Sequence, residues 1–281
     1  MDVGIGLPNA IRGTRGEQLL EWARRGEARG FSKLGTIDRL VYDSYEPLTA
    51  LAAAGAVTSR IGLATTVLLA PLRPNALALA KQALSVHALS GGRFTFGIGL
   101  GARYDDYSES GMETRGRGRR LDEMLAEVRR AWDDERIGPD AAGSPRLIVG
   151  GHADVSFARA ARFGDGWMAG GSGPEEFAGM AEKARAAWEE AGRKEEPHIM
   201  GLAYFSLGER AEQEAETGLG DYYAWLGEEV AGMIVSGAAK DADAVREYLR
   251  AYEEAGCDEL IFFPSSAEPE QVDLLAEAAG L

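Results

Sequence analysis

The chain reads RLIVGGHADVSFARAARFGDGWMA over residues 146–169, and this stretch contains one complete strand–helix–strand unit. The apolar run at residues 146–150 predicts a buried strand, and the helical spacing at residues 154–163 predicts the helix that follows. Gly164 then ends the helix before a second apolar run at residues 166–169. A repeat of this alternation along the chain favours an α/β fold.

The same alternation extends outward from this stretch to both ends of the chain. Apolar runs predict eight strands, at residues 3–8, 31–37, 61–69, 94–100, 146–150, 166–169, 199–207 and 258–263. Helices are predicted at residues 17–29, 47–58, 75–89, 118–133, 154–163, 174–191, 241–255 and 269–279. Eight such units favour a closed (β/α)8 TIM barrel over an open sheet, with residues 1–281 as a single domain. Residues 208–239 depart from the repeat, which predicts an insertion between the seventh strand and its helix.

The composition argues against several kinds of partner and site. The chain has 45 acidic and 30 basic residues, and its net charge of −15 would repel a nucleic acid or an anionic membrane surface. The single cysteine, Cys257, and the histidines His87, His152 and His198 are scattered, so we expect neither a disulfide framework nor a metal site. No apolar run is long enough to span a membrane. We therefore expect a soluble, cytoplasmic protein.

The turn after the fifth predicted strand has features of a phosphate site. Gly150 and Gly151 let the backbone approach a ligand, and the free N–H groups that begin the next helix can bind an anion with help from the Ser156 hydroxyl. The alternative is an ordinary turn that Asp154 caps. His152, at this strand end, could donate to a phosphate, act as an acid–base group, or simply be an exposed turn residue.

Two other strand ends leave alternatives open. Asp38 and Arg39 follow the second strand, and they could bind a polar substrate or pair with each other. Gly97, Gly99 and Gly101 line the fourth strand, but no helix is predicted directly after them, which argues against a dinucleotide site. Small residues at these positions would make room either for a flat ring at the barrel mouth or for close packing of the strands.

Several motifs occur in an order that resembles the bacterial-luciferase-like monooxygenase family. They are SRIGLATTVL at residues 59–68, AKQ at 80–82, LSGGRF at 89–94, GIGLG at 97–101, RRLDE at 119–123, AARFGDGW at 160–167 and AGCDEL at 255–260. The resemblance covers nearly the whole chain. It implies a (β/α)8 barrel that binds FMN, or the deazaflavin F420, at the mouth formed by the C-terminal strand ends.

The resemblance also assigns cofactor-binding positions in this sequence. Thr66 and Val67 match a non-prolyl cis peptide that supports the flavin ring in many members. Three positions fall beside the ring, and these are Gly99, Gly101 and Ala102. Four positions fall where many members hold the phosphate, and these are Gly151, His152, Ala153 and Ser156.

The function that the resemblance implies is that of a monooxygenase using reduced FMN and O2 on a small organic substrate. The alternatives are F420-dependent hydride transfer and a flavin-binding protein without turnover. The candidate catalytic residues are Asp38, Arg39, Arg103 and Tyr104, with Asp106 as a weaker candidate. The two arginines would bind an anionic or carbonyl substrate, and Tyr104 and Asp106 would handle protons. Arg39 replaces a histidine that many relatives carry after the aspartate.

The resemblance also implies partners. Members of the family commonly form dimers through their outer helices, so a homodimer is expected. A separate flavin reductase would be a further partner, because it would supply the reduced cofactor.

Overall fold

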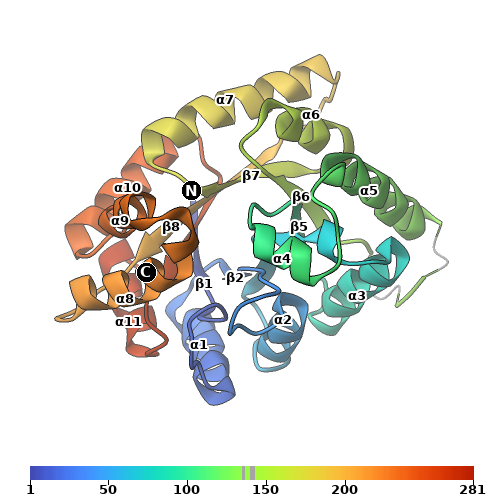
Figure 1. The fold of residues 1–281 in the computed structure, drawn as a ribbon. Helices are drawn as coiled ribbons and strands as arrows, with labels where there is room; N and C mark the ends of the chain where they lie inside the picture. The colour runs from blue at the N-terminus through green and yellow to red at the C-terminus, as the bar shows by residue number, and fades with distance from the viewer. Residues whose placement is uncertain (135–136, 140–142) are drawn as a thin grey trace.

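The computed structural model describes residues 1–134, 137–139 and 143–281, and parallel strands form its centre (Figure 1). The strands are β1 (Asp2–Gly6), β2 (Lys33–Thr36), β3 (Gly62–Thr65), β4 (Leu68–Leu69), β5 (Phe94–Gly99), β6 (Arg146–Gly150), β7 (Gly166–Gly171), β8 (His198–Phe205) and β9 (Glu259–Pro264). Their order is β3-β2-β1-β9-β8-β7-β6-β5-β4, and β3 also pairs with β5. That pairing closes the sheet into the predicted barrel.

The nine strands occupy eight positions because the predicted third strand is divided. β3 ends at Thr65 and β4 begins at Leu68, and both pair with β5. The Thr66–Val67 peptide between them is cis, at the position that the family resemblance implied.

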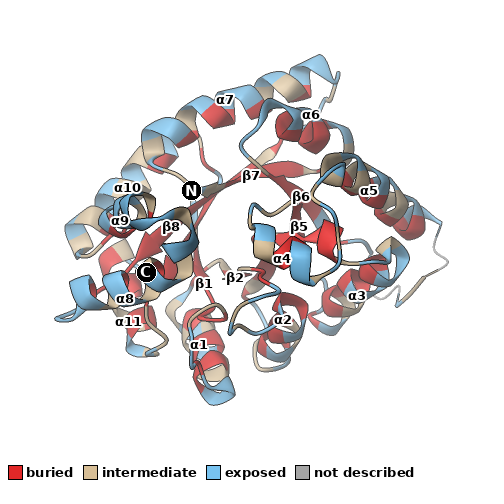
Figure 2. Ribbon diagram, viewed as in Figure 1, coloured by how far each residue is buried: buried red, intermediate tan, exposed pale blue. Residues whose placement is uncertain are grey.

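Helices pack around the barrel and across its mouth, and each of them contains buried residues (Figure 2). They are α1 (Gly16–Arg29), α2 (Pro47–Ala56), α3 (Ala76–Leu89), α4 (Tyr104–Glu109), α5 (Arg117–Asp133), α6 (Asp154–Phe163), α7 (Pro174–Glu190), α8 (Ala211–Tyr223), α9 (Glu228–Ser236), α10 (Ala242–Glu254) and α11 (Glu270–Ala279). Two short 3-10 helices, η1 (Ala70–Leu72) and η2 (Ala224–Leu226), complete the set. None of the described helices is both long and apolar enough to cross a membrane.

Side chains alternate along β8 between two apolar clusters, as the pleat of a strand requires. Met200, Leu202 and Tyr204 belong to the cluster inside the barrel. Ile199 and Phe205 belong to the larger cluster between the strands and the outer helices. The inner cluster continues into α8 and α9, so these two helices cover part of the barrel core at its mouth.

Helix α4 was not predicted from the sequence. Its six residues are too few to show a helical period, and no helix was expected directly after the glycines of the fourth predicted strand. Asp105 and Asp106 in its first turn favour the helix because carboxylates interact well with a helix N-terminus. The buried Tyr107 anchors the helix by donating a hydrogen bond from its hydroxyl to the Leu100 carbonyl.

Candidate functional site

The turn between β6 and α6 has the geometry of an anion site. Ala153 is the N-cap residue of α6, and no described side chain caps the helix, so Asp154 is not the cap that the alternative interpretation required. Gly151 has a φ of 147°, and a Cβ at that position would lie 2.4 Å from Ser156 Oγ. Glycine therefore lets the backbone run directly beside the buried Ser156 hydroxyl at an uncapped helix N-terminus.

His152 is held in place by the backbone of β7. The Gly170 N–H donates a hydrogen bond of 2.9 Å to His152 Nε2. A ring nitrogen that accepts a hydrogen bond carries no proton, so in this arrangement the proton belongs to Nδ1. The exposed imidazole thus offers one N–H donor beside the start of α6.

A cavity of about 520 Å³ opens next to this turn. Two predicted site residues, Ala102 and His152, line it. The rest of its lining comes from β7, β8 and the helices that follow each of them, namely Gly171, Ser172, Gly173, Glu176, Leu202, Ala203, Tyr204, Tyr223, Trp225, Leu226, Val230, Met233, Ile234, Gly237 and Tyr248. The cavity therefore joins the predicted phosphate turn to a large apolar and aromatic surface.

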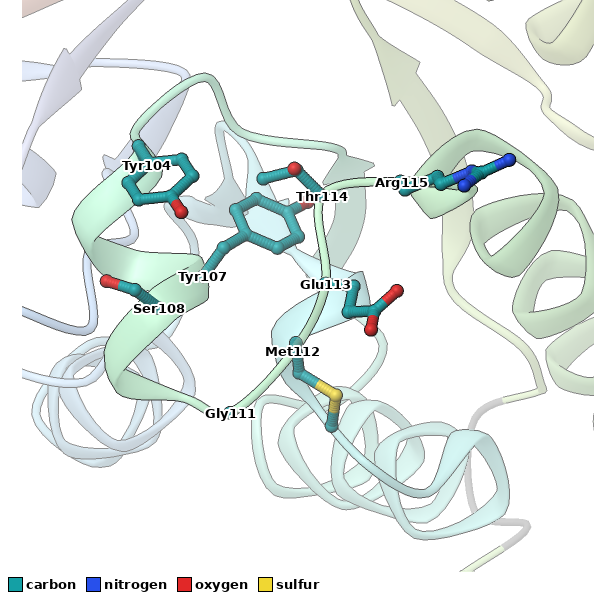
Figure 3. A pocket seen from close by; sticks show the side chains of 8 residues that line it. All are labelled: Tyr104, Tyr107, Ser108, Gly111, Met112, Glu113, Thr114 and Arg115. Carbon is teal, nitrogen blue, oxygen red and sulfur yellow. The ribbon is translucent and has the colours of Figure 1, made fainter.

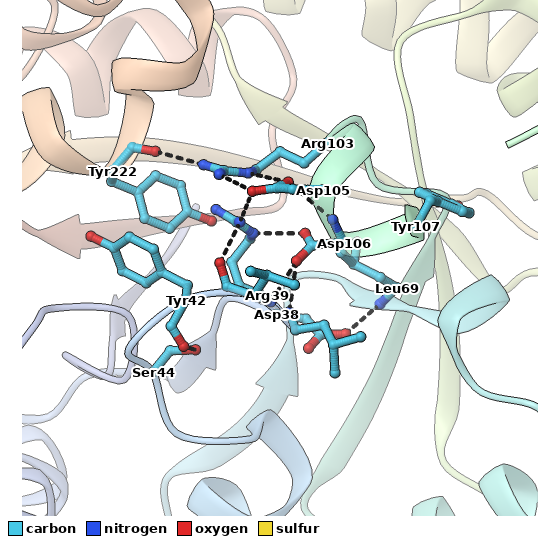
Figure 4. Close-up of polar contacts among 12 residues, drawn as sticks. Asp38, Arg39, Tyr42, Ser44, Leu69, Arg103, Asp105, Asp106, Tyr107 and Tyr222 are labelled. Atoms are coloured by element: carbon cyan, nitrogen blue, oxygen red, sulfur yellow. Dashed lines mark hydrogen bonds and ion pairs between the residues drawn. The ribbon is translucent and has the colours of Figure 1, made fainter. Parts of the chain in front are cut away.

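Asp38 and Arg39 do not pair with each other, although both are buried at the end of β2 (Figure 4). Asp38 accepts a hydrogen bond of 2.7 Å from the Leu69 N–H and forms an ion pair with Arg73. Arg39 Nε donates to Asp106 at 2.7 Å. Asp38 and Arg39 thus each pair with another residue. The alternative in which they pair with each other was wrong.

The Asp106 carboxylate already accepts hydrogen bonds from several groups of the protein. In addition to Arg39, it accepts hydrogen bonds from the N–H groups of Leu40 at 3.0 Å and Val41 at 2.7 Å. The carboxylate is buried in α4 and ties this helix to the loop after β2. These contacts favour a structural role over proton handling.

Arg103 and Tyr104 lie outside the cavity as well. Arg103 Nε donates to Asp105 at 2.9 Å, and its guanidinium lies 5.2 Å from the centre of the Trp225 ring. Tyr104 is 72% exposed and faces a separate surface hollow of about 350 Å³ between α4 and α5 (Figure 3). The structure therefore brings none of the four candidate catalytic residues into the cavity lining that it describes.

The small residues in and just after β5 allow close packing, which was one of the two alternatives for them. A Cβ at Gly99 would lie 2.6 Å from Val67 Cγ2, and a Cβ at Gly101 would lie 2.9 Å from Leu69 Cδ1. The half-buried Val67 therefore fills the space that the glycine leaves open. The roles of Thr66, Val67, Gly99 and Gly101 in binding a cofactor stay predictions.

Most of the cavity lining was not among the predicted site residues. Tyr204 lies inside the predicted seventh strand, and Tyr223 and Trp225 lie in the segment that departs from the repeat. The run Tyr222-Tyr223-Ala224-Trp225 is the sequence signal that could have drawn attention to this segment. Aromatic side chains bury large areas, and so many together in one short segment are typical of a binding surface or a core.

Fold and site together define a TIM barrel with a ligand cavity at the C-terminal ends of its strands, where enzymes of this fold have their active sites. Residues 1–261 match the model of the luciferase-like monooxygenase family, so the chain belongs to that family of flavin-dependent oxidoreductases.

Two relatives illustrate the similarity at the level of sequence. The uncharacterized protein Rv0940c of Mycobacterium tuberculosis (strain ATCC 25618 / H37Rv) is 33% identical over 223 residues, which are 66% of this chain and 77% of that protein. Pyrimidine monooxygenase RutA of Stutzerimonas stutzeri (strain A1501) is 28% identical over 215 residues, or 66% of this chain and 58% of the relative.

Solved structures with this fold include one that contains an F420 adduct and one that contains FMN. An F420-dependent secondary alcohol dehydrogenase in complex with an F420-acetone adduct has a TM-score of 0.82 at 18% identity, over 99% of this chain and 97% of that one. The oxygenating constituent of 3,6-diketocamphane monooxygenase of Pseudomonas putida, in complex with FMN, has a TM-score of 0.78 at 17% identity, over 98% and 96%. Relatives thus use FMN or F420.

Proposed function

We propose that this chain is a monooxygenase that uses reduced FMN and O2 to oxidise a small organic substrate. The observation that carries the proposal is the uncapped N-terminus of α6, with Gly151 on one side of it and the cavity on the other. Free N–H groups at a helix N-terminus bind phosphate well. Membership of the luciferase-like monooxygenase family supports monooxygenation as the reaction.

The residues of this turn fit a flavin phosphate. The N–H groups that begin α6 at Asp154 would donate to the phosphate oxygens, since the N-cap residue Ala153 has no polar side chain that competes for them. Ser156 would add a hydroxyl donor, and His152 would add its Nδ1–H from the cavity side. Each role is available without moving the backbone, because Gly151 keeps the turn free of a Cβ.

The cavity fits the remainder of such a ligand. Its volume of about 520 Å³ is in the range of small-molecule sites, which hold roughly 300–1,000 Å³. A bound reduced flavin supplies the electrons that activate O2, and the protein supplies position and exclusion of water. Leu202, Val230 and Ile234 would exclude water at the far wall.

We also infer that residues 208–239 are an insertion into the barrel repeat, between its seventh strand and the helix that follows. The element order supports this, because two helices and a 3-10 helix (α8, η2 and α9) lie between β8 and α10, whereas the next longest excursion, between β5 and α5, contains the single short helix α4. The insertion would then supply the cavity wall that distinguishes this chain from a plain barrel.

The second candidate function is hydride transfer with F420. The same turn would suit the phosphate of that cofactor, because a helix N-terminus attracts any phosphate group. Fluorescence titrations with FMN and with F420, followed by a measurement of O2 consumption with reduced FMN, separate the two functions. FMN binding with O2 consumption supports the monooxygenase, whereas binding of F420 alone overturns it in favour of hydride transfer.

Two partners belong to the same proposal. A separate flavin reductase would supply reduced FMN, and a second copy of the chain would pair with the first through the outer helices. Light scattering at micromolar concentration tests the dimer, since a 30.0 kDa species alone would contradict it.

A further inference from the structure

The cavity wall opposite α6 is made almost entirely of uncharged side chains. β8 contributes Leu202 and Tyr204, and η2 contributes Trp225 and Leu226. α9 adds three aliphatic side chains, and these are Val230, Met233 and Ile234. Among the described lining residues none is lysine or arginine, and the one carboxylate, Glu176, is exposed to solvent.

The two nearby guanidiniums are already neutralised by carboxylates outside the lining. Arg39 is paired with Asp106, and Arg103 is paired with Asp105. Arg103 also supports the ring of Trp225 from outside the cavity. An anionic group that entered the cavity would lose its hydration without gaining a positive partner, and this costs free energy.

A pair of tyrosines provides the main polar feature of this wall. The hydroxyls of Tyr204 and Tyr223 form a hydrogen bond, and the two rings meet edge to face with centroids 5.8 Å apart. That hydrogen bond uses one of the two hydroxyl protons, and no other described residue accepts the second one. Burial raises the pKa of both phenols, so both stay protonated at neutral pH. The pair therefore retains one hydroxyl hydrogen that it can donate in a hydrogen bond to a ligand oxygen.

We propose that the wall formed by Tyr204, Tyr223, Trp225, Leu226 and Ile234 binds a neutral, largely apolar, ring-bearing substrate, one oxygen of which accepts a hydrogen bond from the Tyr204–Tyr223 pair. This inference rests on the proposed monooxygenase function and specifies its substrate class. It also replaces Arg39 and Arg103 as the expected substrate ligands.

Two probes of nearly the same shape test the charge preference. 2-Acetonaphthone carries a neutral carbonyl, whereas 2-naphthoate carries a carboxylate on the same ring system. Equilibrium dialysis against the full chain, with and without FMN, should show binding of the ketone at least about tenfold tighter than binding of the carboxylate. Equal affinities, or tighter binding of 2-naphthoate, would overturn the proposal.

The double variant Tyr204→Phe/Tyr223→Phe tests the hydrogen bond, because either hydroxyl left alone would still have a hydrogen to donate. It should weaken 2-acetonaphthone binding about fivefold, because one neutral hydrogen bond is lost, and should leave 2-ethylnaphthalene unaffected because that probe has no oxygen. Equal effects on the two probes would show that neither hydroxyl contacts the ligand.

Ile234→Lys introduces a positive charge into the same wall and should shift the preference toward 2-naphthoate. Leu89→Lys is the matched control, since Leu89 is 74% exposed at the end of α3 and should change neither affinity. An unchanged preference in a folded Ile234→Lys protein would contradict the location of the site. FMN binding is measured on the wild-type chain and on each variant. Absence of FMN binding by the wild-type chain counts against the proposed function and not against the substrate class.

Discussion

The barrel mouth has two halves that differ in what fills the space above the strands. In the half over β2–β5, which we call the filled half, α4 and paired charges cover the strand ends, and Val67 occupies the gap beside Gly99. In the half over β6–β8, which we call the open half, α6 begins without a cap and a cavity of about 520 Å³ lies below α8 and α9.

The two halves differ in whether the protein itself pairs the polar groups at the strand ends. Asp38 and Arg39 are charged residues at a strand end, yet each has a protein partner of opposite charge and both lie in the filled half. Ser156 and Gly151 carry no charge, yet they adjoin backbone donors that have no partner within the helix. Under the proposed function, unpartnered donors beside empty space are the better indicator of the site.

The largest expected effect tests whether the filled half is structural. Arg39→Met leaves the Asp106 carboxylate buried without its partner, which should lower the free energy of unfolding by about 3–5 kcal/mol. Urea unfolding followed by circular dichroism measures this change. Arg119→Met is the matched control, because that arginine forms an exposed i,i+4 pair with Glu123 in α5 and should cost about 0.5 kcal/mol or less. A loss no greater than that of the control would show that the Arg39–Asp106 pair does not support the fold.

A second substitution tests how tightly the filled half is packed. A Cβ at Gly97 would lie 2.0 Å from the Thr65 carbonyl oxygen, so Gly97→Ala should destabilise the fold by about 1–3 kcal/mol. In α7, nothing lies within 4 Å of a Cβ at Gly179, and Gly179→Ala should stabilise the protein by about 0.5–1 kcal/mol. If Gly97→Ala unfolds at the same urea concentration as the wild type, the space beside β5 is open and the comparison fails.

A third substitution probes the open half by ligand affinity. Ser156→Ala removes a hydroxyl donor beside Gly151 and should weaken FMN binding about tenfold, through loss of a hydrogen bond to a charged group. Riboflavin lacks the phosphate and should bind the variant and the wild type equally, as isothermal titration calorimetry would show. Parallel losses for both ligands would point to damage of the fold.

The smallest effect concerns the attachment of α8 to the barrel. Asp221 accepts hydrogen bonds from Tyr42 Oη at 2.5 Å and from Arg12 Nε at 2.6 Å. Because the ion pair is exposed, Arg12→Gln should shift the urea midpoint only slightly, and high salt should abolish the difference. A shift of the urea midpoint as large as that of Gly97→Ala would mean that this contact is a main support of α8.

The same contact has a defined pH dependence. The hydrogen bond from Tyr42, together with Arg12, lowers the pKa of Asp221 from its ordinary value. A lowered pKa contributes stability above the unfolded value of about 3.9, and this contribution is lost as the pH falls through the lower folded value. The difference between Arg12→Gln and wild type should therefore shrink in strong acid.

Much of the fold could be predicted from the sequence because its signals are local. Apolar runs and glycine caps identified the barrel strands and the main outer helices to within a few residues, as in α6, which spans Asp154–Phe163 as expected. Helix α4 was missed because six residues do not show a period.

The candidate site was predictable only where one short segment builds it. The turn from Gly151 to Ser156 is such a segment, and its glycine and helix start are visible in the sequence. The contact between Tyr204 and Tyr223 joins residues 19 positions apart, and it depends on how α8 lies over β8. No local pattern gives that placement, and the partners of Arg39 and Asp38 were hidden for the same reason.

Hydrogen–deuterium exchange on the full chain, with FMN and with riboflavin, tests most directly whether the α6 N-terminus binds the phosphate. The first N–H groups of α6, at Asp154 and Val155, have no carbonyl partner within the helix, so in the free protein they should exchange quickly, whereas the Ser156 N–H donates to the Ala153 carbonyl at 2.7 Å. We predict that FMN slows exchange in residues 150–157 and that riboflavin does so much less. Protection by FMN elsewhere, with residues 150–157 unchanged, would contradict the account.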